Sequence, residues 1–142
     1  MDFSFTEAQD AIRDTLSRLC AKYDADYWRT RDAEGGMPEN FVAEIANGGW
    51  LGIAMPEEYG GAGLGVTEAA IMMQTIAESG AAMSGASAIH VAIFGLNPVV
   101  VFGTEDQKRR ALPPLIAGAD RACFGVTEPN AGLDTSKIET RA

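Results

Sequence analysis

The sequence predicts a mainly all-α fold, an N-terminal helical bundle followed by the first strand of a second, β-rich domain. Three observations predict it. Apolar residues recur every three or four positions through most of residues 1–118, which is the period of a helix. Glycine and proline divide that region into short segments. After residue 118 the sequence changes to a short apolar run without helical period.

The first helix is expected to begin at Thr6, because Thr6 and Gln9 have the spacing of a capping box. One face of this helix is apolar, with Phe5, Ala8, Ile12, Leu16, Leu19 and Tyr23. A weaker helical stretch runs past Trp28 until Gly35–Gly36 ends it. Pro38 then opens a short helix, which stops at Gly48–Gly49.

Residues 49–65, GWLGIAMPEEYGGAGLG, contain a proline and many glycines and are expected to form a loop. Glycine-rich loops can bind phosphate groups. The spacing of the glycines here fits neither the dinucleotide-binding fingerprint nor a P-loop, which also requires a Lys followed by Ser or Thr. A tight loop packed between helices is the favoured interpretation.

Two apolar helices are expected next, from Thr67 to about Ser79 and from about Ser84 to Phe94, with Pro98 kinking the second before residues 99–102. Both are predicted to be buried. Between Glu78 and Glu105 the only titratable side chain is that of His90, and this gap is long enough to span a bilayer. Several glycines, Asn97 and Pro98 interrupt the gap, so a buried core helix is favoured over a membrane span.

The helical region is expected to close with one more helix, which a second capping box at Thr104 and Gln107 begins and Gly118 ends. This makes five or six helices. Residues 121–126 then read as a strand that enters a new sheet. We therefore predict an N-terminal α-helical domain over residues 1–118 and the incomplete start of a middle β-barrel domain over residues 119–142.

Charge and cysteine content exclude several functions. The net charge is −9, with 20 acidic against 11 Lys and Arg residues, which argues against a nucleic-acid partner. Cys20 and Cys123 lie far apart, with no spacing typical of a metal site or a disulfide framework. No secretion or transit signal is recognisable at the start of the chain, so we expect a cytoplasmic protein without a metal site.

Three segments together resemble the acyl-CoA dehydrogenase family. Residues 123–142, CFGVTEPNAGLDTSKIETRA, look like the signature segment of that family. LGIAMPEEYGGAGLG and FGTEDQKRRALPPLIAG are similar to two further segments in the same order and spacing. Members of the family are longer than this chain, and the resemblance implies that it corresponds to their N-terminal part.

The resemblance implies an FAD site in which Phe124, Val126 and Thr127 contact the flavin, the last two near its pyrimidine edge. Hydrogen-bond donors there stabilise the charge that develops as the ring accepts a hydride. Gly132 would allow close approach of the backbone to cofactor and substrate. Leu133 stands where a Ser or Thr is usual, so it would offer cofactor and substrate only its backbone N–H, and Lys137 replaces a small residue.

His90 has two interpretations. A single histidine on an apolar helix is commonly a packed residue with one nitrogen satisfied. By resemblance, the helix that carries His90 lines the far end of the acyl pocket, where His90 would help to select the acyl group. The small residues Gly85, Ala86 and Ala88 on that helix would then favour a medium or branched acyl chain.

The implied reaction is α,β-dehydrogenation of an acyl-CoA thioester, as in fatty acid metabolism, with hydride transfer to FAD. No residue of this chain is expected to be the catalytic base, which the family takes from a Glu in a C-terminal bundle. Glu128 and Asp134 are interpreted as turn carboxylates. An electron-transfer acceptor protein and a homotetramer are implied as partners. The alternatives are a flavin-dependent monooxygenase or oxidase on the same scaffold and a non-catalytic helical association module.

Overall fold

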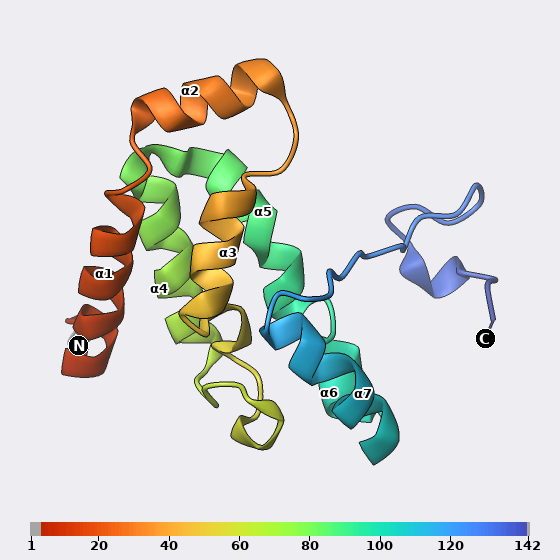
Figure 1. Ribbon diagram of the computed structural model, residues 1–142. Coiled ribbons are helices and arrows are strands. Elements are labelled where there is room, and N and C mark those ends of the chain that lie inside the picture. The colour runs from red at the N-terminus through yellow and green to blue at the C-terminus, as the bar shows by residue number, and fades with distance from the viewer. Residues whose placement is uncertain (1–3, 142) are drawn as a thin grey trace.

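The computed structural model describes residues 4–141, and helices dominate it (Figure 1). Within that range the chain forms seven α-helices, which confirms the predicted mainly α-helical class. Their bounds are α1 Glu7–Cys20, α2 Ala25–Glu34, α3 Glu39–Asn47, α4 Val66–Ile76, α5 Ala82–Phe94, α6 Asn97–Phe102 and α7 Glu105–Ile116. The structure has one helix more than the upper expectation, because Leu96, with φ −96° and ψ 11°, separates α5 from α6.

Both predicted capping boxes are present. The Thr6 hydroxyl accepts the Gln9 N–H at 3.2 Å, and the Gln9 side chain accepts the Thr6 N–H at 3.0 Å. Thr104 and Gln107 make the same reciprocal pair at the start of α7. The Gln9 amide also donates to Glu68 at 2.9 Å, so the start of α1 is joined to the first turn of α4.

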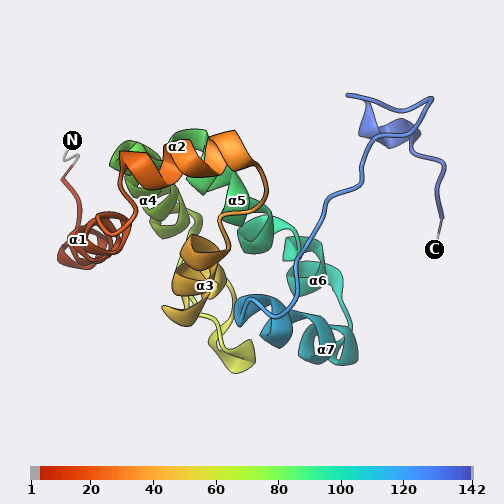
Figure 2. The same cartoon turned by 45° about the horizontal axis from the view of Figure 1, so that its top comes forward.

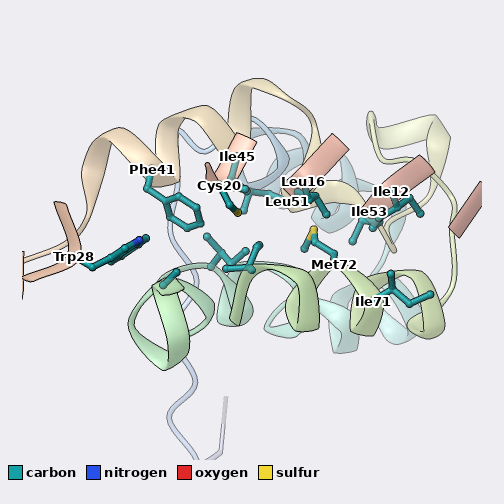
Figure 3. Close-up of a cluster of buried hydrophobic side chains, with 13 residues drawn as sticks. Ile12, Leu16, Cys20, Trp28, Phe41, Ile45, Leu51, Ile53, Ile71 and Met72 are labelled. Carbon is teal, nitrogen blue, oxygen red and sulfur yellow. The ribbon is translucent and has the colours of Figure 1, made fainter. Parts of the chain in front are cut away.

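The main core lies between α1, α3, α4 and the buried side of α5 (Figure 3). Phe41 is fully buried beside Trp28 at one end of this core, and its ring meets that of Trp28 edge to face at 5.2 Å and that of Tyr23 at 5.4 Å. The buried members of the main core are Ile12, Leu16, Cys20, Trp28, Phe41, Ile45, Leu51, Ile53, Ile71, Met72, Ile76, Ala81 and Ile89. Burial raises the pKa of the Cys20 thiol, which therefore stays protonated and packs as an apolar group.

The glycine-rich loop is a packing element. Its two short 3₁₀ helices, Trp50–Gly52 and Glu57–Tyr59, bring Met55 and Tyr59 against Leu112, Leu115 and Ile116 of α7. A Cβ at Gly61 would lie 2.1 Å from the Met55 carbonyl oxygen, so this position admits only glycine. The structure thus agrees with a tight loop between helices.

The junction between α4 and α5 is strained. A π-helical turn, Ala77–Ala81, joins them, and inside it Gly80 has φ 97°. Ala82 follows with φ 47° and ψ −141°, the one positive φ at a non-glycine residue in the described range. Such a conformation costs an L-residue about 1–3 kcal/mol.

We expect Ala82→Gly to stabilise the protein by about 0.5–2 kcal/mol, since the relief of strain exceeds the entropic cost of glycine, about 0.5–1 kcal/mol. Urea unfolding followed by circular dichroism measures the change. Ala81→Gly is the control, because Ala81 is buried with φ −66°, and this variant should lose stability. If Ala82→Gly unfolded at a lower urea concentration than the parent protein, the backbone at Ala82 would not be strained.

The run from Val66 to Phe102 is long enough to cross a membrane, and an 18-residue stretch of it has a mean hydropathy of 1.7. Kinks at Gly80 and Ala82 interrupt it. Only 17% of that stretch is buried within the described chain. The expectation that both helices are buried is therefore wrong: each has one buried face. The buried residues are Ile71, Met72, Thr75 and Ile76 in α4 and Gly85, Ala86 and Ile89 in α5, and α6 has none.

Residues 121–126 do not form the predicted strand. They are extended, and the only bridge in the part of the chain that the structure describes joins Glu128 and Ala131. A strand requires a neighbouring strand to bond its backbone, and residues 4–141 supply none. Figure 2 shows the segment leaving α7, passing the end of α5 and continuing to a small separate lobe. The division between residues 1–118 and 119–142 stays a prediction.

Candidate functional site

An apolar groove of about 400 Å³ lies where the end of α5 meets α6 and the beginning of α4. Its lining comes from five segments: Ala54 and Met55, Val66 and Ala69, Ile93 and Phe94, Asn97, Pro98 and Val100, and Phe124. Phe124 is the member contributed by the extended segment. The groove can therefore accept an apolar group beside that segment.

Two aromatic contacts connect the predicted flavin and substrate residues. The Phe124 ring lies 5.9 Å from the Phe94 ring, which in turn lies 5.2 Å from the His90 imidazole. His90 and Phe94 are four residues apart on α5 and therefore share one face. From the sequence, Phe94 was predicted only as part of a buried helix, and its spacing from His90 is the signal that could have assigned it to the site.

His90 is half-buried, and its Nδ1 lies 3.3 Å from the carbonyl oxygen of Ser87 on the same helix. The structure thus places one ring nitrogen against its own helix. His90 does not line the groove itself but reaches it through Phe94. Both interpretations of His90 agree with this placement.

The backbone next to Phe124 has unused hydrogen-bonding groups. Residues 121–127 make no backbone hydrogen bond with the described chain, and the Thr127 side chain is exposed and without a partner there. Val126, which lies between Phe124 and Thr127 in the sequence, is half-buried. Free N–H and hydroxyl donors beside an aromatic ring fit the polar edge of a flavin, so the residues present fit part of an FAD site.

Gly132 and Leu133 are not brought to the groove. Both are exposed and belong to the lobe of residues 128–140. A Cβ at Gly132 would meet nothing within 4 Å, so no neighbour in the described chain requires glycine there. Leu133 is fully exposed. The structure therefore joins Phe124 with the region of His90 and leaves Gly132 and Leu133 apart.

The carboxylates of the signature segment are held by their own lobe. Glu128 accepts the backbone N–H groups of Glu139 and Thr140, and these bonds hold the pKa of its carboxyl below the usual value. Asp134 accepts the Ser136 hydroxyl and pairs with Lys137 at 3.2 Å, which likewise lowers its pKa. Both carboxyls are therefore ionised at neutral pH and occupied by local contacts.

Similarity to known proteins extends over nearly the whole chain. Residues 6–119 match the family profile described as acyl-CoA dehydrogenase, N-terminal domain. Acyl-CoA dehydrogenase fadE12 of Mycobacterium tuberculosis is 34% identical over 99% of this chain, which spans 36% of that relative.

Two solved structures share the fold. Butyryl-CoA dehydrogenase from Megasphaera elsdenii is 32% identical over 96% of this chain and 36% of its own, with a TM-score of 0.82. A chain in a structure of the electron-transferring flavoprotein of Acidaminococcus fermentans has a TM-score of 0.84 at 32% identity, over 96% of this chain and 36% of its own. The region of similarity is thus about a third of the length of each of these proteins.

Proposed function

The chain belongs to the acyl-CoA dehydrogenase family, whose N-terminal domain it matches over residues 6–119, and on this premise we propose that it is the N-terminal part of an FAD-dependent acyl-CoA dehydrogenase. The parent protein would oxidise an acyl-CoA thioester between Cα and Cβ. An electron-transferring protein would accept the electrons, and the parent would work as a cytoplasmic homo-oligomer.

One observation carries the proposal: an aromatic ring, an apolar groove and free backbone donors meet at Phe124. The groove would take the apolar acyl group, and Phe94 would separate it from His90. Val126 and Thr127 would hold the flavin edge through N–H and hydroxyl groups. FAD, when bound, supplies a hydride acceptor.

The chain's own part in this reaction is to bind, orient and exclude water. Apolar side chains in the groove would keep water from the acyl group, which strengthens polar contacts at its edge. Glu128 and Asp134 are ionised, but their oxygens bond within the lobe, so neither is proposed as the base. The base would be supplied by a region of the parent protein outside residues 1–142.

The test is Thr127→Ala in the full-length protein. Loss of one donor from the flavin edge should weaken FAD binding or slow flavin reduction. The expected change is about 1–3 kcal/mol in the free energy of binding or in the activation free energy of reduction. Equilibrium binding of FAD and stopped-flow reduction by an acyl-CoA measure both. Thr15→Ala is the control, because Thr15 is an exposed threonine on α1, a helix that contributes no residue to the groove. Equal affinity and equal reduction rates in the two variants would remove Thr127 from the site.

A further inference from the structure

A single side chain closes the lobe of residues 128–140. Glu128 Oε2 accepts the backbone N–H of Glu139 at 2.9 Å, and Oε1 accepts that of Thr140 at 2.9 Å. The backbone of Glu128 also exchanges two hydrogen bonds with Ala131, at 2.9 and 3.1 Å. Glu128 therefore fixes the near end of the lobe with its backbone and the far end with its carboxylate.

The other hydrogen bonds of this lobe within the described residues are local. Asp134 bonds Ser136 and Lys137, and the Ile138 N–H donates to Thr135. None of these joins the beginning of the lobe to its end. The Glu128 carboxylate is thus the hydrogen-bonding link between the two ends among residues 4–141.

The closed lobe has a defined inside and outside. Ala131 is buried, whereas the next two residues, Gly132 and Leu133, are exposed. Hydrogen bonds from backbone N–H groups to a carboxylate are stronger than those between neutral groups. If both hydrogen bonds to the Glu128 carboxylate were broken, residues 139 and 140 would no longer be held to the start of the lobe. The exposed residues Gly132 and Leu133 would then be less constrained.

We propose that Glu128 is a positioning residue, which closes the lobe of residues 128–140 and thereby holds Gly132 and Leu133 in place for cofactor and substrate. The role toward cofactor and substrate rests on the proposed function, extended to Gly132 and Leu133 by the resemblance to the family's signature segment, since in residues 4–141 these two residues lie apart from the groove. The closure of the lobe is a property of residues 128–140 and can be measured separately.

The experiment compares Glu128→Gln with Glu139→Gln in the full-length protein. The two variants make the same chemical change in the same lobe, but the Glu139 side chain is exposed and makes no hydrogen bond in the described chain. A glutamine at 128 keeps one acceptor and turns an NH₂ group toward a backbone N–H. Hydrogen exchange of the Glu139 and Thr140 amides, FAD affinity, and KM against kcat with saturating FAD are measured.

For Glu128→Gln we expect amide exchange at residues 139 and 140 to be about tenfold faster, because charge-assisted hydrogen bonds are lost. The Kd for FAD and the KM for the acyl-CoA should rise by a similar factor, while kcat changes by less than about twofold. Glu139→Gln should match the parent in each measurement. A general loss of folding would instead lower the yield and kcat of holoenzyme together.

Unchanged exchange at residues 139 and 140 in Glu128→Gln would overturn the closure. Faster exchange with FAD affinity and KM equal to those of Glu139→Gln would overturn the positioning role. If the parent protein binds no FAD, the proposed function fails and the role toward cofactor fails with it. The exchange measurement then still decides whether Glu128 closes the lobe.

Discussion

Phe41→Ala is expected to destabilise the helical region by about 3–5 kcal/mol, the usual cost of removing a buried phenylalanine. Phe41 is completely buried and contacts the rings of Trp28 and Tyr23, which belong to other segments of the chain. Neither ring can fill the space without leaving its own contacts. Because domains of this size are stable by about 5–15 kcal/mol, the variant should unfold at much lower urea concentration.

Phe102→Ala is the matched control. It removes the same side chain from a position that is 85% exposed at the end of α6, where the change should stay within about 0.5 kcal/mol. Urea unfolding of both variants, followed by circular dichroism at the helix band, measures the difference. Similar losses in the two variants would show that burial of Phe41 does not stabilise the helical region.

The second large effect concerns residues 1–142 in isolation. We expect this chain neither to retain FAD through purification nor to oxidise an acyl-CoA with an artificial electron acceptor, whereas the full-length protein does both. The groove beside Phe124 is about 400 Å³ and open, while ligand sites normally enclose most of their ligand. The proposed base also lies outside these residues.

Flavin absorbance after gel filtration and acyl-CoA-dependent dye reduction test both parts of this expectation. Thr127→Ala in the short chain serves as the control for a contaminating dehydrogenase. Turnover by the short chain that disappears in the Thr127→Ala variant would place the base within residues 1–142 and contradict the proposed division of the site.

Helix ends were predictable because local interactions set them. The pairs Thr6–Gln9 and Thr104–Gln107 bond across three residues, so the sequence alone contains both partners. Glycines stop helices by the conformation of their own backbone, as Gly35 does with φ 74° at the end of α2. The apolar period of α1 was only partly right about burial: Ile12 and Leu16 are buried, whereas Phe5 and Ala8 are exposed. The period also missed Cys20, which is buried.

Which apolar residues of α5 and α6 are buried was not predictable in this way. These helices are apolar on most sides, so their pattern does not mark a buried face. Packing decided that Ile89 enters the core while Phe94 and Phe102 remain exposed. The site depends on this outcome, because Phe94 reaches both His90 and Phe124.

The sequence by itself determined the mainly helical class, the capped helix starts and the segments that resemble the family, since each depends on residues close together in the chain. Only the tertiary structure decided that residues 121–127 remain extended, that Phe124 joins the groove and that Glu128 reaches residues 139 and 140. These features depend on partners distant in sequence or on a missing neighbouring strand. Hydrogen bonds and packing between such partners form only after the chain has folded, so no local pattern encodes them.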